Sequence, residues 1–229
     1  MKNQYFGDIH DFKKYTLLHW FMNDSDKKLL IAWYLTEDDK IKKDGNKKIL
    51  SEECYHALAE FLKNNNKKDV KVIEKRSDFI GKHVGFFSEY LKSERKNWFE
   101  KLKNKAQKFD IVFMDPDNGI KFDNSDSVKH VLMDEIKEIW KMGKSIIIYQ
   151  HFPMINHEAV MAGYVYKLFK ELKNIKKPFI AIVFSSDVMY IFILQGKDKY
   201  LFENVMENIK KCGKNFLDIF EFSTENIKS

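Results

Sequence analysis

Three clusters of polar residues follow apolar runs in this sequence, and side chains of these types can bind and orient a small ligand. The first cluster is Asp-Pro-Asp-Asn at 115–118, directly after the apolar run at 111–114. The others are Gln-His-Phe-Pro at 150–153 and Tyr-Leu-Thr-Glu-Asp at 34–38. Carboxylate, amide and imidazole groups form hydrogen bonds with ligands, and carboxylates and imidazoles also exchange protons with them. Asp and Asn also cap or turn a chain, so each cluster has a purely structural interpretation as well.

The apolar runs before these clusters are predicted to be buried strands. The runs at 29–35, 109–115 and 144–153 are mostly continuous, as expected for strands covered by helices on both faces. The segments 178–184 and 188–194 flank a short Ser-Ser-Asp turn and predict an antiparallel hairpin. The other predicted elements are helices at 51–62, 127–143, 155–173 and 198–211, a weak strand at 70–73, two helices within 78–106 and a terminal strand at 215–222.

This order of elements predicts an α/β fold. We expect a mostly parallel Rossmann-like sheet with helices on both faces and an antiparallel C-terminal hairpin. Ligands of such sheets bind at the carboxyl ends of the strands, so the three polar clusters are expected to line one crevice. The 229 residues suit one domain, 1–229, in which 51–106 is a candidate inserted helical lobe.

Composition restricts the environment of the protein more than its function. The formal net charge of +6 and the pI near 9.0 fit a nucleic-acid partner, although a genome of low GC content also yields Lys-rich proteins. Cys54 and Cys212 form no metal-binding motif, so we expect a reduced cytoplasmic protein. The N-terminus is polar, and no apolar run approaches the roughly 20 residues that span a bilayer, so we expect no membrane association.

The segment Gly-Asp-Ile-His-Asp-Phe-Lys-Lys-Tyr at 7–15 resembles a motif of the class I S-adenosylmethionine-dependent methyltransferases. The resemblance is to the bacterial enzymes that methylate adenine N6 in large-subunit ribosomal RNA, which begin with the pattern G-N-x-A-D-x-x-K-H. Gly7, Asp11 and Lys14 match this pattern, whereas positions 8, 10 and 15 depart from it. The cluster at 115–118 stands where the family has Asp-Pro-Pro-Tyr, and 149–153 stands where the family has a strand ending in an aromatic residue and a proline.

The resemblance implies that the chain binds S-adenosylmethionine and methylates an amino group, with nucleic acid as the substrate class. In the family, a carboxylate and a main-chain carbonyl accept hydrogen bonds from the target amino group and aim its nitrogen at the sulfonium methyl. Together with the strand-end clusters, this gives two sets of candidate residues. Those for the chemistry are Asp115, Pro116, Asp117, Asn118 and His151. Those for the cofactor are Gly7, Asp8, Asp11, Lys14, Tyr15, Tyr34 and Thr36.

Two features of the sequence depart from the family. Asn118 replaces the aromatic residue that stacks on a flipped-out base, and Phe152 and Phe122 are the candidates to replace it. The loop after the first strand, 33–38, has no glycine, whereas the family has a glycine-rich loop that lets the backbone approach the cofactor. The side chains of this loop are therefore expected to enter the space of the cofactor, and its two acids to repel the cofactor carboxylate.

A second class of function also fits the carboxylates. A metal-dependent nuclease or phosphohydrolase on the same scaffold would hold Mg²⁺ or Mn²⁺ between Asp115 and Asp117, with Asp8, Asp11 or His151 as further ligands. An Asp-x-Asp pair at the end of a strand is common by chance, so the pattern alone does not select this class.

A third class is a non-catalytic module that binds RNA or a protein partner. Basic charge interleaved with Tyr90, Trp98 and Phe99 would serve this function. Aromatic residues at helical spacing are, however, more often part of a core.

Overall fold

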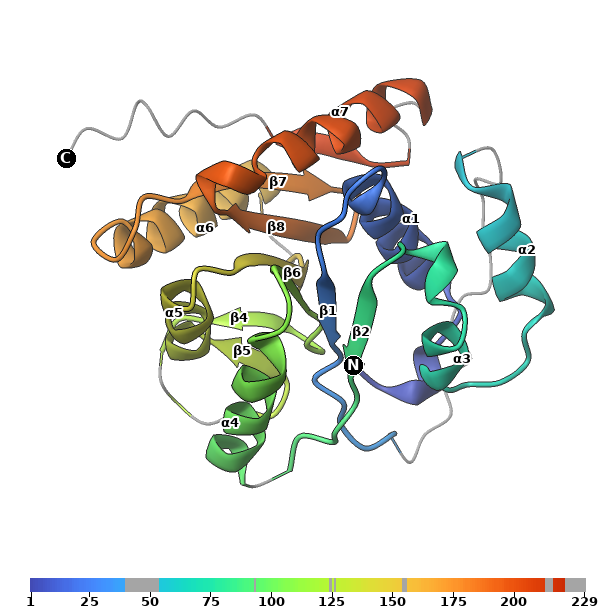
Figure 1. The fold of residues 1–229 in the computed structure, drawn as a ribbon, viewed down its shortest axis with the longest axis horizontal. Coiled ribbons are helices and arrows are strands. Elements are labelled where there is room, and N and C mark those ends of the chain that lie inside the picture. Colours follow the sequence, from blue (N-terminus) through green and yellow to red (C-terminus); the bar gives the residue numbers. More distant parts are fainter. Residues whose placement is uncertain are drawn as a thin grey trace.

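The computed structural model is built around a seven-stranded sheet (Figure 1). The structure describes residues 1–39, 54–92, 94–123, 125, 127–153, 156–212 and 216–220. Its strands are β1 (Leu29–Ala32), β2 (Val84–Phe87), β3 (Ile111–Met114), β4 (Gly119–Lys121), β5 (His130–Leu132), β6 (Ser145–His151), β7 (Phe179–Phe184), β8 (Val188–Leu194) and β9 (Asp218–Phe220). Its α-helices are α1 (Ile9–Met22), α2 (His56–Asn64), α3 (Lys71–Glu74), α4 (Arg95–Ala106), α5 (Met133–Lys141), α6 (His157–Leu172) and α7 (Tyr200–Cys212).

The order of strands in the main sheet is β2-β1-β3-β6-β8-β7-β9. The first four strands are parallel to one another, whereas β8 lies between β6 and β7 and is antiparallel to both. β9 pairs antiparallel with β7, and β4 and β5 form a separate two-stranded parallel sheet. The predicted α/β class, with a mostly parallel sheet and an antiparallel C-terminal hairpin, is therefore confirmed.

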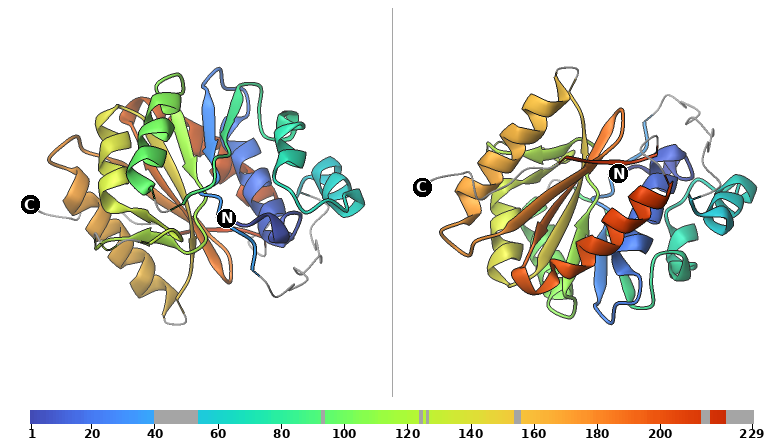
Figure 2. Two further views of the ribbon diagram at one scale, coloured as in Figure 1. Left: turned by 90° about the horizontal axis from the view of Figure 1, so that it is seen from below. Right: turned by 90° about the horizontal axis from the view of Figure 1, so that it is seen from above.

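Helices cover both faces of the sheet, which explains the continuous apolar runs. Successive side chains of a strand point to opposite faces. In β1, Leu29 and Ile31 pack in the core beneath α1, α2 and α7, whereas Leu30 and Ala32 pack in the core beneath α4, α5 and α6. Figure 2 shows these two groups of helices on opposite sides of the strands. Both faces of the parallel strands are thus withdrawn from water, so an apolar residue is favoured at every position.

Helix α1 connects the N-terminal segment to the sheet. Asp8 caps the helix, because its side chain accepts hydrogen bonds from the main-chain N–H groups of His10 and Asp11. Most of the side chains of α1 are buried, and the helix packs against α7 on the same face of the sheet. This packing sets the polar residues of its first turns at the carboxyl ends of the parallel strands.

The weak strand predicted at 70–73 is wrong. Residues Lys71–Glu74 form the short helix α3, in which the N–H groups of Ile73 and Glu74 donate to the carbonyl of Val70. Val70 and Ile73, three residues apart, are the buried pair, and that spacing is helical.

The two helices predicted within 78–106 are also wrong in part. Among the residues of this range that the structure describes, only Arg95–Ala106 form an α-helix, and Val84–Phe87 is the edge strand β2, parallel to β1. Two helices are predicted in this range because Gly81 and Gly85 interrupt its helical pattern, but the structure gives Gly85 another role. A Cβ at this position would lie 2.3 Å from the ring of Phe109, so the strand needs glycine for this close approach.

Other predicted elements stand with adjusted ends. The helix predicted at 127–143 is wrong in its first part, where His130–Leu132 forms β5, and it is confirmed at α5 (Met133–Lys141). Gly143 follows α5 with a φ of +73°. The start of the helix predicted at 51–62 and the ends of the strand predicted at 215–222 lie outside the described residues. The segment 51–106 contributes β2 to the main sheet, and its division from the rest of the chain as a lobe stays a prediction. Within the described ranges, every helix is too short or too polar to span a bilayer.

Gly119→Ala is expected to destabilise the protein by more than about 2 kcal/mol, because it strains the backbone and displaces buried hydrogen bonds. Gly119 has a φ of +96°, and an added Cβ would lie 2.0 Å from Oε1 of Gln150. That oxygen accepts from the N–H of Ile120 (2.7 Å), while Nε2 donates to the carbonyl of Asn118 (3.0 Å). Urea unfolding monitored by circular dichroism measures the change in the free energy of unfolding.

The matched control is Gly163→Ala in α6, where an added Cβ meets no atom within 4 Å. This variant is expected to be stabilised by about 0.5–1 kcal/mol, because alanine restricts the unfolded chain more than glycine does. Equal stability of the two variants would contradict the tight packing of Gly119 against Gln150.

Candidate functional site

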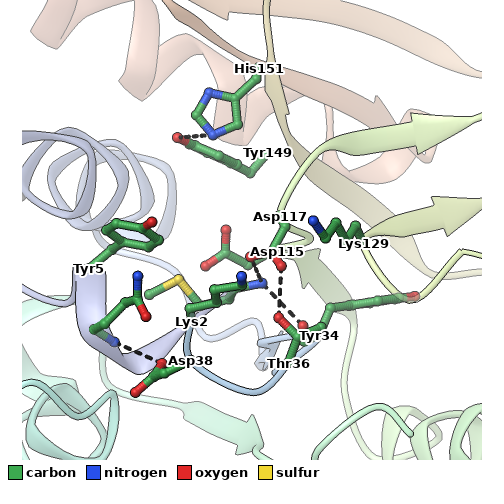
Figure 3. A network of polar contacts seen from close by, with 12 residues as sticks. Lys2, Tyr5, Tyr34, Thr36, Asp38, Asp115, Asp117, Lys129, Tyr149 and His151 are labelled. Atoms are coloured by element: carbon green, nitrogen blue, oxygen red, sulfur yellow. Dashed lines mark hydrogen bonds and ion pairs between the residues drawn. The ribbon is translucent and has the colours of Figure 1, made fainter. Parts of the chain in front are cut away.

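A pocket of about 500 Å³ lies at the carboxyl ends of β1, β3 and β6. Its walls come from segments far apart in the sequence, the N-terminal segment and the tips of the strands (Figure 3). The N-terminal segment contributes Met1, Lys2, Tyr5, Asp8, His10, Asp11 and Lys14. The later segments contribute Asp39, Asp115, Pro116, Asp117, Asn118, Lys129, Tyr149 and His151. This is the edge of the sheet at which open parallel sheets bind ligands.

A buried ion-pair cluster forms the floor of this pocket. The Lys14 ammonium lies 2.9 Å from Oδ1 of Asp11 and 2.7 Å from Oδ2 of Asp115. The side chains of Lys14 and Asp115 are 3% and 1% exposed, so the surrounding water is almost fully excluded. Burial opposes the charge of Lys14, but the two carboxylates outweigh burial and raise its pKa. Burial raises the pKa of Asp115, and the charge of Lys14 acts in the opposite direction.

The motif at 7–15 folds as a turn that leads into α1. Gly7 has a φ of +86°, and its N–H donates to Oδ2 of Asp11 over 2.8 Å. Asp11 therefore joins the turn at Gly7 to the ammonium of Lys14. Desolvation, and then the neighbouring charge of Asp11, raise the pKa of Asp8 to about 6, although His10 acts in the opposite direction.

Asp117 joins the loops that follow β1 and β3. Its Oδ2 accepts from the hydroxyl of Thr36 over 2.7 Å, and its Oδ1 lies 2.7 Å from the amino group of Met1. That amino group also donates to the carbonyl of Tyr34 over 3.1 Å. Both carboxylate oxygens of Asp117 thus have partners within the chain, so this side chain stabilises the wall of the pocket by joining Thr36 to Met1.

The opposite wall carries two histidines and a tyrosine. The Tyr149 hydroxyl lies 3.3 Å from Nε2 of His151, as Figure 3 shows. The ring of His10 lies edge-on to that of His151, with 6.0 Å between centroids. Nε2 of His10 is 3.2 Å from the carboxylate of Asp187, in the turn between β7 and β8.

Two predicted cofactor residues lie in the core instead of the pocket. Tyr15 is fully buried beneath the α1 face of the sheet. Tyr34 points to the opposite face, where its hydroxyl donates to Glu135 over 3.2 Å. Trp33 packs against Tyr15 and Phe86. These aromatic side chains of the glycine-free loop therefore fill the two cores, and the prediction that they enter the ligand space is wrong for both Trp33 and Tyr34.

The remaining predicted residues lie at the pocket or support it. Asp8, Asp11, Lys14, His151 and the cluster at 115–118 line it. Gly7 and Thr36 bond to residues that line it. Phe152 stacks on His157, with 3.9 Å between centroids, and Phe122 packs against Tyr164. Neither phenylalanine is a wall of the pocket, so the aromatic rings available there come from tyrosines and histidines.

Sequence reasoning missed several residues of the pocket. Tyr149 was available from the pattern, since it lies two positions before His151 on the same strand and therefore on the same face. Lys2, Tyr5 and Asp39 come together through contacts between the first turn of the chain and the loop after β1. Lys129 precedes β5, and nothing in its local sequence marks it as a site residue.

The fold and the pocket together define the class of the molecule, an α/β protein with a Rossmann-like sheet and a polar site at its carboxyl edge. Comparison of the sequence with protein-family models gave no match, and a search among curated proteins gave none either. Across the described residues, no group of three or more His, Cys, Asp and Glu side chains has the arrangement of a metal site.

Lys14→Met is expected to lower the free energy of unfolding by about 3–5 kcal/mol, because it leaves two buried carboxylates without their cation. The double variant Lys14→Met/Asp115→Asn is expected to lose less than the sum of the two single losses, since the second change removes one of the unpaired charges. Urea unfolding at pH 7 measures the free energy of unfolding of the two single variants and of the double variant.

Lys13→Met, at a partly exposed neighbouring position, is the control and should change the free energy of unfolding by less than about 0.5 kcal/mol. A loss below about 1 kcal/mol for Lys14→Met would overturn the assignment of a buried ion pair.

Asp8→Asn is expected to stabilise the protein above pH 6. A raised carboxyl pKa means that the folded state binds more protons than the unfolded state between the ordinary pKa of 3.8 and about 6. The stability of the wild type therefore falls as the pH rises through this window. Asparagine keeps a capping side chain and removes the charge, so the gain should reach at most about 3 kcal/mol at pH 7. It should vanish below pH 3.8. Unfolding curves for both proteins across this range measure the difference, and a pH-independent difference would contradict the raised pKa.

Proposed function

We propose that this protein is a divergent class I S-adenosylmethionine-dependent methyltransferase that acts on an amino group of nucleic acid. The observation that carries the proposal is the contact between Lys14 and Asp115. Lys14 belongs to the motif-like segment at 7–15, and Asp115 opens the cluster that stands at the family's Asp-Pro-Pro-Tyr. These residues lie 101 positions apart, yet their side chains meet over 2.7 Å at the carboxyl edge of the sheet.

The topology of the sheet gives independent support. The resemblance implies a mostly parallel sheet that ends in an antiparallel hairpin. In the observed order, β8 is inserted antiparallel between β6 and β7, after four parallel strands. The clusters after β1, β3 and β6 consequently lie on adjacent strands, as a shared binding crevice requires.

The residues of the pocket fit the chemical groups of S-adenosylmethionine. A volume of about 500 Å³ is within the range of small-molecule sites, roughly 300–1,000 Å³. The cofactor carries two cationic groups, a sulfonium and an ammonium, which the carboxylates of Asp8 and Asp115 would favour. Lys129 would pair with its carboxylate, and the ring of Tyr5 offers a surface for its adenine. When bound, the cofactor supplies an electrophilic methyl group.

The chain itself would orient the nucleophile. One oxygen of Asp115, Oδ2, is held by Lys14, so the carboxylate is fixed in direction and its other oxygen can accept an N–H of the target amino group. Orientation by a preformed hydrogen-bond acceptor lowers the barrier because no reorganisation is needed at the moment of reaction. The Asn118 side chain replaces the stacking aromatic of the family, so we expect a different group to hold the base or a substrate that needs no stacking platform.

The competing metal-dependent reaction has less support from the geometry. The oxygens of Asp11 and Asp115 that face each other across the floor of the pocket are bridged by the ammonium of Lys14. The carboxylate of Asp117 is engaged by Thr36 and Met1. A divalent cation between these carboxylates would have to displace a buried lysine, which would then lose its counter-ions. The third class of function, a non-catalytic binding module, stays a prediction.

Titration calorimetry with S-adenosylmethionine and S-adenosylhomocysteine tests the proposal. We expect micromolar binding by the wild type and at least roughly tenfold weaker binding by Asp8→Ala, because a carboxylate at the pocket wall is lost. Asp134→Asn, an exposed carboxylate at the start of α5, is the matched control and should bind like the wild type. Absence of heat at millimolar concentrations of both ligands, with wild-type circular dichroism, would refute cofactor binding by this chain.

A further inference from the structure

We propose that His151 accepts the proton released when the target amino group is methylated, with Tyr149, His10 and Asp187 as positioning residues. This inference rests on the proposed function and adds a specific step to it. When the nitrogen bonds to the methyl group, it becomes positively charged. Its N–H bond then breaks, the electron pair returns to nitrogen and the proton moves to the imidazole. The methyl donor would keep the electron pair of the broken carbon–sulfur bond, and the imidazolium of His151 returns the proton to water.

The contacts of Asp11, Asp115 and Asp117 make these three carboxylates of the pocket poor proton acceptors. Asp11 and Asp115 are both engaged by the ammonium of Lys14, and Asp117 by Thr36 and the amino group of Met1. A carboxylate in such a pair is a weak base, because protonating it would leave the buried cation without a partner. His151 lies on the wall of the same pocket, and its Nε2 contacts the neutral hydroxyl of Tyr149.

The register of the sheet sets His151 at a suitable place. β3 and β6 are parallel neighbours, and Met114 is the partner of Ile148. Asp115 is therefore level with Tyr149, and His151 is two residues further along the strand, roughly 7 Å at the usual rise per residue. Tyr149 and His151 point to the same face as Lys14, whose ammonium lies 5.2 Å from the Tyr149 ring. A group held by Asp115 would thus lie between that carboxylate and His151.

The neighbours of His151 hold its ring and influence its charge. The Tyr149 hydroxyl contacts its Nε2, and the edge-on ring of His10 is in turn held by Asp187. Desolvation by the surrounding chain, and then His10, lower the pKa of His151 below its ordinary value. The charge of Lys14 also lowers the pKa of His151, whereas the charges of Asp187 and Asp117 raise it. A neutral imidazole at neutral pH is the form that accepts a proton.

His151 also has a way to pass the proton on. Its side chain is exposed at the rim of the pocket, in contrast to the buried Asp115 and Lys14. Asp187, beside His10, is exposed as well. A base that reaches both the pocket and bulk water can return to its neutral form after each reaction.

The test is the pH dependence of single-turnover methyl transfer from radiolabelled S-adenosylmethionine. The probes are unmodified transcribed RNA and unmethylated single-stranded DNA. We expect the wild-type rate to fall at acidic pH as His151 becomes protonated. His151→Asn should lose about 10²-fold or more in rate and also lose this acidic limb, with cofactor affinity unchanged. Tyr149→Phe should lower the rate less and shift the limb.

His157→Asn is the matched control, because His157 stacks on Phe152 outside the pocket and should keep the wild-type rate and profile. A His151→Asn variant with wild-type rate and pH profile would overturn the role of His151 and leave the methyltransferase proposal intact. Failure of the wild type to methylate any probe would overturn both. Circular dichroism of each variant distinguishes loss of chemistry from loss of fold.

Discussion

The buried ion pair between Lys14 and Asp115 is the interaction on which the site depends. A carboxylate at the end of a fully covered strand loses its hydration, at a cost of several kcal/mol unless a cation replaces the water. Lys14 supplies that cation from α1, and Asp11 shares it. This contact therefore fixes the position of α1 relative to the carboxyl edge of the sheet and its rotation about its own axis. Through Asp11 the same cluster fixes the turn at Gly7, so the N-terminal segment and the strand ends become one structure.

This constraint divides the pocket into two chemically different walls. On the floor and one side, the carboxylates of Asp11, Asp115 and Asp117 have cationic or hydroxyl partners and act as oriented acceptors. On the other side, His10, Tyr149 and His151 are linked by weaker contacts, and His151 is exposed to solvent. A site of this type can hold a cationic cofactor and a weakly nucleophilic amine, while proton transfer is left to the side that reaches water. The proposed methyl transfer and the proposed role of His151 both depend on this division.

The sequence predicted the parts of the fold that periodicity controls. β1, β3, β6 and the β7–β8 hairpin follow from continuous apolar runs, because both faces of these strands are covered. The sequence did not predict β2, because a glycine at position 85 indicates a helix break, and its packing against Phe109 is known only from the structure. The helix α3 was predicted to be a strand, because four residues carry little periodic information. At the site, spacing singled out Lys14 and Asp115, but Lys2, Asp39 and Lys129 reach the pocket only through tertiary contacts. The directions of Tyr15 and Tyr34 depend on which face of α1 and β1 each occupies, and local sequence does not fix that.

The most direct test of the ligand site is amide hydrogen exchange with and without saturating S-adenosylhomocysteine. A site around Lys14 and Asp115 predicts that ligand slows exchange together in three segments distant in sequence, the N-terminal segment 1–15, the β3 tip at 115–118 and the β6 tip at 149–152. Exchange in α6, on the other face of the sheet, should not change. Protection restricted to another surface, or no protection at concentrations where binding is saturated, would contradict the placement of the ligand site around Lys14 and Asp115.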